Sequence, residues 1–357
     1  MSRILIAMSG GVDSSVAAYL LKKAGHECIG VTMKLYENDT VAYTGHTCCS
    51  LDDIDDARIV SAKLGMDYFV YDFSERFEAE VIDKFVAYYE KGWTPNPCID
   101  CNRYLKFEDL YKRAKELDCD YIATGHYARI DYDRDLHRYR LLKGPDEKKD
   151  QSYVLYSLTQ EQLAHTLFPL GEYEKSDVRK IAEEAGLVNA KKHDSQDICF
   201  VPDGDYKAFL ERREKKTYPA GNIVDEEGHV LGRHDGAVGY TIGQRKGLGI
   251  ACGHPVYVVD KDMDTNTVVV GNKESLKKRV LVAADFHWLS VSETDRLKVT
   301  ARTRYHGPET AATLIDEKNG RVRVLFDEPH GAIARGQAVV CYDGDTVIGG
   351  GTIVEVE

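Results

Sequence analysis

The first 125 residues alternate between short, nearly continuous apolar runs and amphipathic segments. The apolar runs predict buried strands at Arg3–Met8, Glu27–Met33, Asp67–Tyr71 and Asp120–Thr124. The amphipathic segments predict helices at Ser14–Ala24, Leu51–Leu64, Glu75–Lys91 and Phe107–Leu117. Strands that are apolar on both faces and alternate with helices form a parallel sheet covered on both sides. The expected fold class is therefore α/β, with an N-terminal Rossmann-like parallel sheet that binds its ligands at the carboxyl ends of the strands.

The pattern of apolar positions changes twice after residue 125. Strand-like segments at Tyr127–Asp131 and Tyr139–Leu142 are followed by short helical patterns near Glu161–Leu167 and Ser176–Ala185. From about residue 206 to 275, glycines punctuate short segments and predict a small central β-containing domain. Alternating strands then predict a C-terminal all-β barrel or sandwich, at Leu297–Arg304, Arg321–Phe326 and Ala338–Tyr342. We therefore expect domains at residues 1–205, 206–278 and 279–357.

Length and composition are those of an ordinary globular protein. The 357 residues are enough for two or three domains, with 43% hydrophobic and 30% charged residues. No apolar run approaches the roughly 20 residues of a membrane span, and no signal-peptide pattern opens the chain, so we expect a cytoplasmic protein without membrane contact. The net charge of −12 argues against indiscriminate nucleic-acid binding but leaves room for local basic patches.

A glycine turn lies between the first apolar run and the first amphipathic segment, at Ser9–Ser15 (Ser-Gly-Gly-Val-Asp-Ser-Ser). The glycines let the backbone bend tightly, and the free N–H groups of the helix start point at a bound anion. No Gly-Lys-Ser/Thr ending follows, so the loop is not the P-loop of kinases and GTPases. Asp13 would cap the helix or help to hold a metal ion. The loop predicts a phosphate site.

A Cys-x-x-Cys pair follows a proline-stiffened segment, Thr94–Pro97, and places Cys98 and Cys101 ahead of Arg103 and Lys106. Neighbouring cations favour the thiolate, so we expect a reactive pair in a loop. Cys199 is a third candidate. Cys28, Cys119, Cys252 and Cys341 lie in strand-like apolar settings and are expected to be buried and structural. A structural zinc site usually needs a second Cys-x-x-Cys, which the chain lacks.

The combination of a nucleotide loop, a reactive cysteine pair and a distant third cysteine resembles the tRNA-specific 2-thiouridylases of the PP-loop ATP pyrophosphatase group. The resemblance covers essentially the whole chain. It is carried by Ala7–Ser15, Val31–Met33, Cys48–Ser50, Thr94–Pro97, Cys101–Asn102, Lys106–Phe107, Ala123–Tyr127, Lys149–Tyr153, Asp194–Phe200 and Tyr240–Arg245.

The resemblance implies a particular reaction. ATP adenylates the C2 oxygen of the wobble uridine in tRNA, and pyrophosphate leaves, held by the glycine loop and Mg²⁺. A persulfide on Cys199 then delivers sulfur to C2, and AMP departs. Cys101 is the nucleophilic partner that frees the sulfur or closes a disulfide with Cys199. A cysteine desulfurase or sulfur-relay protein is the implied sulfur donor.

The resemblance also assigns site residues. The ATP contacts would be Ala7, Met8, Ser9, Gly10, Gly11, Val12, Asp13, Ser14, Met33 and Gly125. The contacts to the target base and tRNA would be Asn96, Pro97, Cys98, His126, Lys149, Asp150, Gln151, Arg304, Tyr305 and Gln337. From the residues themselves, basic candidates for the RNA surface are Lys298, Arg302, Arg304 and the turn Gln244–Lys246.

Position 98 departs from the commonest family pattern, because it is Cys where many relatives carry Asp. Cys98, Cys101 and Cys199 could together hold a [4Fe–4S] cluster with one iron open to sulfide. The persulfide route and the cluster route therefore stay open as alternatives.

Two further readings differ in class. The chain could be a small-molecule ATP pyrophosphatase that forms amides, although such an enzyme needs neither the cysteine pair nor an RNA platform. It could also be a non-catalytic RNA-binding or iron–sulfur protein, against which the intact Ser9–Ser15 loop argues. Pyrophosphate release that depends on tRNA would separate these readings.

Overall fold

The computed structural model describes residues 1–36, 51–193 and 198–357, so Cys48, Cys49 and Asp194–Asp197 lie outside the described residues. The first domain is built on a sheet with the strand order β3-β2-β1-β4-β7, and every neighbouring pair is parallel. The strands are β1 (Arg3–Ala7), β2 (Glu27–Lys34), β3 (Asp67–Asp72), β4 (Tyr121–Ala123) and β7 (Thr166–Leu167). The predicted Rossmann-like parallel sheet is confirmed.

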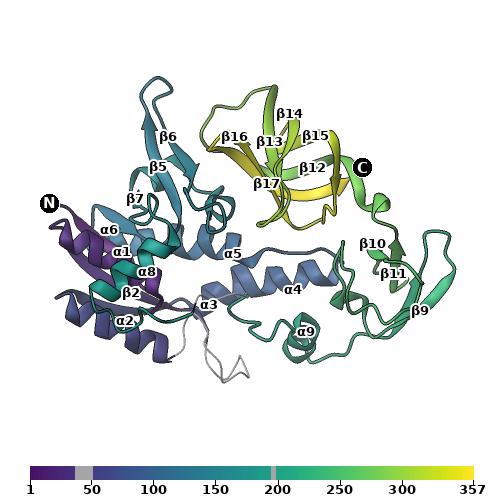
Figure 1. Ribbon diagram of the computed structural model, residues 1–357, viewed down its shortest axis with the longest axis horizontal. Helices are drawn as coiled ribbons and strands as arrows, with labels where there is room; N and C mark the ends of the chain where they lie inside the picture. The colour runs from purple at the N-terminus through teal and green to yellow at the C-terminus, as the bar shows by residue number, and fades with distance from the viewer. Residues whose placement is uncertain (37–50, 194–197) are drawn as a thin grey trace.

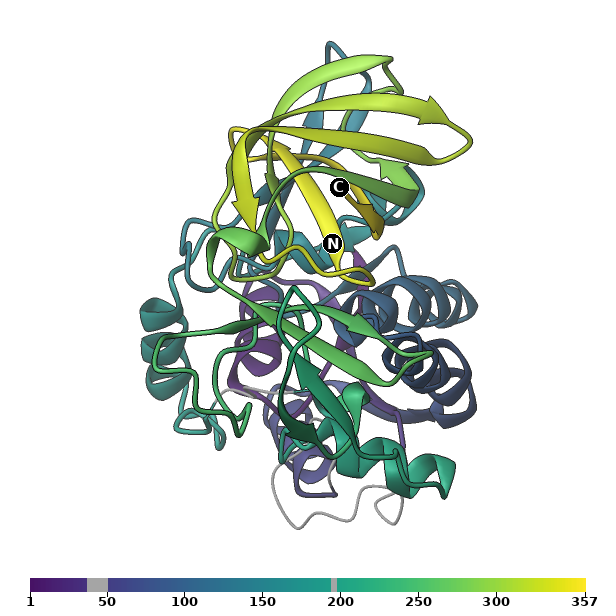
Figure 2. The ribbon, with the colours of Figure 1, turned by 90° about the vertical axis from the view of Figure 1, so that its right-hand side faces the viewer.

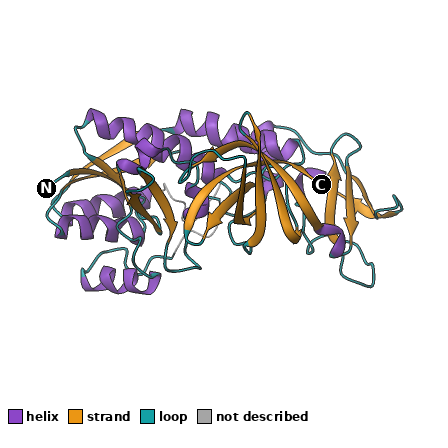
Figure 3. Ribbon diagram, turned by 90° about the horizontal axis from the view of Figure 1, so that it is seen from above, coloured by secondary structure: helices purple, strands orange, loops and turns teal. Residues whose placement is uncertain are grey.

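Helices cover both faces of this sheet (Figure 3). They include α1 (Val12–Lys23), α2 (Leu51–Lys63) and α8 (Lys175–Glu184). The helix expected at Glu75–Lys91 is an unbroken helical stretch made of α3 (Ser74–Phe77), a π-helical turn η1 (Glu78–Ile82) and α4 (Asp83–Glu90). Strand β1 is fully buried at Ile4, Leu5 and Ile6, because it lies at the centre of the sheet with helices on either side.

The helix expected at Phe107–Leu117 begins ten residues earlier than predicted. The chain is helical from Pro97 through α5 (Pro97–Asp100), the π-helical segment η2 (Cys101–Asp109) and α6 (Leu110–Glu116). Pro97 occupies the first helical turn, where a missing N–H costs nothing. The π-helical segment breaks the 3.6-residue period, which explains why the amphipathic pattern did not reveal it. The predicted cysteine loop is therefore the start of a helix.

Residues near Glu161–Leu167 also differ from the expectation. Helix α7 (Gln160–Ala164) ends early, and Thr166 and Leu167 form β7, which pairs with Ile122 and Ala123 of β4. A two-residue edge strand is too short to produce a periodic signal.

The central domain contains α9 (Tyr206–Glu214) and a mixed sheet in the order β10-β11-β8-β9. Its strands are β8 (Gly221–Val224), β9 (Val230–His234), β10 (Tyr257–Asp262) and β11 (Thr267–Gly271). Ile223, Val258 and Val268 form its small core.

The C-terminal domain is a closed antiparallel barrel, as predicted. Its strand order is β12-β15-β14-β13-β16-β17, and β17 pairs back with β12 to close it. The strands are β12 (Lys277–Trp288), β13 (Arg296–Arg302), β14 (Thr310–Lys318), β15 (Arg321–Gly331), β16 (Ala338–Asp343) and β17 (Thr346–Val356).

The barrel sits against the first domain rather than apart from it. A hairpin of that domain, β5 (Ala128–Asp133) and β6 (Arg138–Lys143), projects beside the barrel and joins it where Thr346 pairs with Leu142 (Figure 1). Figure 2 shows the barrel above the other two domains. In the described residues, no helix has both the length and the apolar character that crossing a membrane requires.

Candidate active site

The loop after β1 approaches α2 so closely that it requires glycine at position 10. Gly10 has φ +71°, and a Cβ at this position would lie 2.2 Å from the Asp53 carbonyl oxygen of α2. The loop is fixed from below, since the Met8 N–H donates to the Val31 carbonyl at 2.7 Å and Thr32 Oγ1 donates to the Met8 carbonyl at 2.6 Å. The turn therefore presents its backbone rigidly at the carboxyl end of the sheet.

The start of α1 is suited to an anion. Gly11 is the N-cap and no side chain caps the helix, while Ser14 and Ser15 donate their hydroxyls back to the Gly11 carbonyl at 3.1 and 3.0 Å. Ser9 N–H donates to Ser14 Oγ at 3.2 Å, which holds the loop folded over the helix start. Helix N–H groups and the helix dipole then favour negative charge at this position.

Gly125 brings β4 against the same loop. A Cβ on Gly125 would lie 2.8 Å from both the Asp13 carbonyl carbon and the Ser14 nitrogen. The sequence correctly singled out the Ala123–Tyr127 segment, because it follows a strand whose carboxyl end meets the loop.

Side chains that the sequence did not single out hold the loop from the region after β7. Both carboxylate oxygens of Asp13 accept from Lys175 Nζ, at 2.7 and 2.8 Å, and one also accepts from Tyr127 OH at 2.7 Å. Asn189 Nδ2 donates to the Gly10 carbonyl, the Gly11 carbonyl and Ser15 Oγ. Lys175 and Asn189 lie more than 100 positions from the loop and carry no local motif, so only the fold reveals them, whereas Tyr127 belongs to the Ala123–Tyr127 segment.

Lys192 forms a second clamp beside the glycine turn. Its ammonium donates to Asp53 and Asp56 at 2.6 Å each and to the Gly10 carbonyl at 3.3 Å. Burial opposes the charge, but hydrogen bonds and the two carboxylates outweigh it and raise the pKa of Lys192. Lys192 is thereby fastened both to the glycine loop and to α2.

The cysteine pair lies at the start of the Pro97 helix. Cys98 is exposed and Cys101 is half-buried. Burial raises the pKa of Tyr305 in the barrel to about 12, and the negative charges of Asp150 and Cys98 add to this rise. Cys98 therefore lies near Tyr305. Arg103, which was expected to favour the thiolates, donates to Asp285 of β12 at 2.5 Å, so its charge is shared with a barrel carboxylate.

Cys199 is attached to the same core as Cys101. Tyr36, just after β2, donates its hydroxyl to the Cys199 carbonyl at 3.1 Å. Phe200 packs edge-on against Phe77 and Phe85. Cys101 and Cys199 both pack on the large hydrophobic cluster that contains Tyr36 and Met33, the residue expected beside the adenosine. The fold thus packs these cysteines, almost 100 positions apart, on one large core, and Tyr36 holds Cys199 near the carboxyl end of β2.

The remaining described cysteines divide as predicted with one exception. Cys28, Cys119 and Cys341 are buried, and burial raises the pKa of each thiol, to about 11 for Cys28. Cys252 is only half-buried and lies in a loop, so its expected strand setting is wrong, because the glycines around it interrupt β-structure.

Several expected tRNA contacts are buried inside the protein. His126 packs against the rings of Phe107 and Phe168 and shares a hydrogen bond of 2.7 Å with Thr124. Asp150 is 4% exposed and accepts hydrogen bonds from backbone and from Arg302 at 3.1 Å. His126 and Asp150 therefore offer almost no surface to RNA, and the guanidinium of Arg302, whose side chain is 15% exposed, is held by Asp150 and Glu309.

Other expected contacts line the seam between the barrel and the first domain. Gln337 donates to the Thr94 and Pro95 carbonyls, at 3.1 Å each, just before Asn96 and the buried Pro97. Gln151 accepts from the Tyr127 N–H at 3.0 Å, next to the half-buried Lys149. Exposed basic side chains remain at Lys298, Arg304, Arg245 and Lys246.

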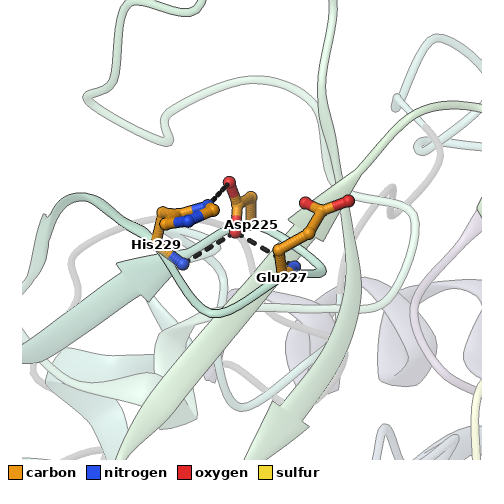
Figure 4. Close-up of side chains that lie close together, drawn as sticks. All are labelled: Asp225, Glu227 and His229. Carbon is orange, nitrogen blue, oxygen red and sulfur yellow. Dashed lines mark hydrogen bonds and ion pairs between the residues drawn. The ribbon is translucent and has the colours of Figure 1, made fainter.

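One group of potential metal ligands occurs among the residues that the structure describes. Asp225, Glu227 and His229 place ligand atoms within 4.8 Å of one another in the turn between β8 and β9 (Figure 4). Asp225 accepts hydrogen bonds from the Glu227 and His229 backbones and from the His229 ring. These contacts explain the group as an exposed hairpin turn. The sulfurs of Cys98, Cys101 and Cys199 do not form such a compact group.

A parallel α/β domain with a phosphate-type glycine loop, followed by a small β domain and a closed barrel, defines a nucleotide-binding enzyme of the PP-loop class. Family models match in the same order: the tRNA methyl transferase HUP domain at residues 2–203, the tRNA methyl transferase PRC-barrel domain at 207–272 and the aminomethyltransferase beta-barrel domain at 278–353. The chain is 54% identical over 354 residues to a tRNA-specific 2-thiouridylase of Moorella thermoacetica, covering 99% of each chain. It is 49% identical over 352 residues to that of Clostridioides difficile, covering 98% of each. The chain therefore belongs to the tRNA-specific 2-thiouridylase family.

Solved structures give a weaker likeness. An NMN synthetase from Francisella tularensis is 17% identical with a TM-score of 0.35, over 61% of this chain and 79% of that one. A 4-thiouridine synthetase in complex with RNA and ATP is 19% identical with a TM-score of 0.35, over 56% and 45% of the two chains.

Proposed function

We propose that this protein is an ATP-dependent tRNA-uridine 2-sulfurtransferase that acts on the wobble uridine. The observation that carries the proposal is the hydrogen bond from Tyr36, just after β2, to the Cys199 carbonyl, because β2 is the neighbour of the strand that leads into the glycine loop. A thiolation that is driven by ATP needs the ATP site and the sulfur-delivering cysteine close to the same base. Family membership and near-complete coverage of the relatives support the same conclusion.

ATP would bind with its phosphates at the Ser9–Ser15 loop. The loop residues would cradle the phosphates through backbone N–H groups and hydroxyls, while Met33 and Gly125 would border the adenosine. Adenylation turns the C2 oxygen of uridine into a good leaving group, and the loop stabilises the charge of departing pyrophosphate. Mg²⁺ usually binds one or two carboxylates together with substrate phosphates, and Asp13 is the carboxylate that fits this role. When bound, the ion would neutralise phosphate charge.

Sulfur would be carried by Cys199 as a persulfide. Its terminal sulfur attacks C2, the bond from C2 to the adenylated oxygen breaks, and AMP leaves with that electron pair. The Cys101 thiolate then attacks the Cys199 sulfur, which closes a disulfide and leaves the second sulfur on C2. A thiol reductant restores the two cysteines, and a cysteine desulfurase or relay protein reloads Cys199.

The tRNA would lie over the seam between the first domain and the barrel. The exposed basic side chains Lys298, Arg304, Arg245 and Lys246 would contact phosphates, and Tyr305 would lie beside the base pocket formed with Asn96 and Cys98. The uridine must leave its stack to reach this pocket. The pocket would be supported by Lys149, Gln151 and Gln337. The side chains of Gln151 and Gln337 would act through their hydrogen bonds to backbone groups of neighbouring segments. We place the reaction in the cytoplasm, where such tRNAs are met.

A [4Fe–4S] cluster on Cys98, Cys101 and Cys199 is the second candidate for the sulfur step. Cys98 and Cys101 are three residues apart at a helix start, which puts both on one helix face, and Cys199 would have to approach them for three sulfurs to hold one cluster. Anaerobic purification followed by iron and acid-labile sulfide assays separates the two routes. Iron-free protein that still thiolates tRNA removes the cluster.

The central test is mass analysis of tRNA nucleosides after incubation with ATP, Mg²⁺ and a sulfur source. We expect 2-thiouridine at the wobble position, and pyrophosphate release that requires tRNA. Omission of ATP serves as the control. Pyrophosphate release with a small molecule in place of tRNA would support the amide-forming alternative and overturn the proposal.

A further inference from the structure

Lys175 lies at the phosphate loop although it is far from it in sequence. It is the first residue of α8, 8% exposed, and its ammonium contacts both Asp13 oxygens at 2.7 and 2.8 Å. Tyr127 OH donates to Asp13 at 2.7 Å, and the ammonium lies 5.7 Å from the Tyr127 ring centre. Helix α8 packs on α1, whose first turn carries Asp13. The buried ammonium of Lys175 is therefore held next to the first turn of α1 by its contact with Asp13.

The glycine loop lacks the lysine that ordinary P-loops carry at their end. A triphosphate needs positive charge beyond backbone N–H groups. Lys192 is the other ammonium beside the loop, but two carboxylates, Asp53 and Asp56, hold it at 2.6 Å each. Lys175 contacts the carboxylate of Asp13 in the first turn of α1, so its charge lies at the helix start where an anion would bind.

We propose that Lys175 is the phosphate-binding cation of this site, supplied by α8 in place of a P-loop lysine. This inference rests on the proposed function. Its ammonium pairs with Asp13 until a nucleotide and a divalent cation bind. The divalent cation then replaces the ammonium on Asp13, and the flexible four-carbon stem lets the ammonium move to phosphate oxygens. The Asp13 carboxylate has a positive partner before and after this exchange, and the phosphates have one once bound. No buried charge is therefore left unpaired.

The proposal predicts opposite effects on two ligands, which a purely structural ion pair does not. In Lys175→Gln, the amide can still donate to Asp13, but the charge is gone. We expect inorganic pyrophosphate, titrated calorimetrically with Mg²⁺ present, to bind about 10- to 100-fold more weakly, the loss of one hydrogen bond between charged groups. We expect Mn²⁺ alone, followed by electron paramagnetic resonance, to bind more tightly, because the ammonium no longer competes for Asp13.

Matched variants keep the test decisive. Lys180→Gln removes an exposed ammonium from the same helix and should change neither affinity. Lys175→Arg keeps the charge and should retain most pyrophosphate affinity even where Lys175→Gln folds poorly by circular dichroism. In an Asp13→Asn background, the gain in Mn²⁺ binding should vanish.

The outcomes separate the two proposals. If the wild-type protein binds neither ATP nor pyrophosphate, the proposed function fails. If the wild-type protein binds pyrophosphate and folded Lys175→Gln binds it equally well, Lys175 is only a structural partner of Asp13 and the inference is overturned. Weaker binding of both pyrophosphate and Mn²⁺ in Lys175→Gln would overturn the exchange of partners as well.

Discussion

Cysteine side chains in the described part of the chain differ chiefly in exposure. Burial raises the pKa of Cys28, Cys119 and Cys341, which makes these thiols poor nucleophiles. Cys98 is exposed, and Cys101 and Cys199 are half-buried. A reactive thiol needs access as well as a thiolate, so exposure leaves Cys98, Cys101, Cys199 and the half-buried Cys252, and we propose that the first three carry the chemistry.

Replacing Cys199 tests its role as the sulfur carrier. Cys199→Ser removes the only atom that can hold a persulfide at this position, while Tyr36 contacts the backbone carbonyl and keeps its partner. We expect thiolation to be abolished and ATP affinity to stay within about twofold, measured by nucleoside mass analysis and calorimetry. Cys252→Ser, at another half-buried cysteine, is the matched control. Thiolation that survives in Cys199→Ser would refute the assignment.

His126 gives the protein a pH-dependent stability. Its burial, with a smaller contribution from Lys106, holds the pKa well below the ordinary 6.5, so the folded state keeps the ring neutral. The unfolded chain takes up a proton below about 6.5, and the free energy of unfolding therefore falls as the pH drops through that range.

We expect the His126→Asn variant to lose less stability than the wild type between pH 7.5 and 5.5. The difference should be about 1 kcal/mol, measured by urea unfolding. His254→Asn, which replaces an exposed histidine, serves as the control, and its free energy of unfolding should change between pH 7.5 and 5.5 as in the wild type. Equal slopes in His126→Asn and wild type would show that other groups set the pH dependence.

The functional elements at the next scale are the glycine loop and the Pro97 helix. The loop is a turn whose position is fixed by β1 below, by α2 beside Gly10 and by Asn189 above. The helix begins at Pro97 and carries Cys98 and Cys101 on its first turns. A rigid element at each place sets where phosphate and sulfur can meet.

Gly10→Ala tests the loop as an element. The new Cβ would meet the Asp53 carbonyl oxygen at 2.2 Å with φ at +71°, so the loop must move. We expect ATP affinity to fall by at least about 100-fold, since the backbone N–H groups lose their alignment. Gly25→Ala has a similar φ of +85° with nothing within 4 Å, and should cost stability without changing ATP affinity. Calorimetry measures the ATP affinity of both variants. Normal ATP affinity in Gly10→Ala would contradict the role of the glycine loop in phosphate binding.

At the scale of the molecule, the barrel holds the cysteine helix in place. Gly336 lies so close to the first domain that a Cβ would meet the Trp93 Cβ at 3.0 Å, and the Thr94 N–H donates to the Arg335 carbonyl at 2.8 Å. Arg103 of the helix pairs with Asp285 of the barrel. Close packing, a hydrogen bond and an ion pair therefore connect the barrel to the helix that carries Cys98 and Cys101 and to the segment before it.

Gln337→Ala should weaken the contact between the barrel and the segment before the cysteine helix without changing the affinity for ATP. Removing the amide deletes the hydrogen bonds to the Thr94 and Pro95 carbonyls. We expect faster amide exchange in residues 93–97 and a fall in kcat/KM for tRNA of about 5- to 10-fold, from the loss of roughly 1 kcal/mol of positioning. ATP affinity is the internal control. Unchanged exchange in residues 93–97 would contradict the role of the barrel as a support.

Local sequence determined the elements with strong periodicity and the chemistry with short spacing. The parallel sheet, the glycine loop, the Cys98–Cys101 pair and the closed barrel could all be predicted, because apolar period and glycine position act within a few residues. The π-helical stretch Cys101–Asp109 and the two-residue β7 could not, since neither produces a regular period.

Only the tertiary structure decided which distant side chains complete the site. Lys175, Asn189 and Lys192 reach the loop, and Gln337 reaches the segment just before the cysteine helix, through contacts between segments far apart in the sequence. The burial of His126 and Asp150 likewise depends on packing from several elements. A sequence pattern records the local backbone, whereas the partner of a charge or a hydrogen bond is chosen by how the domains fold together.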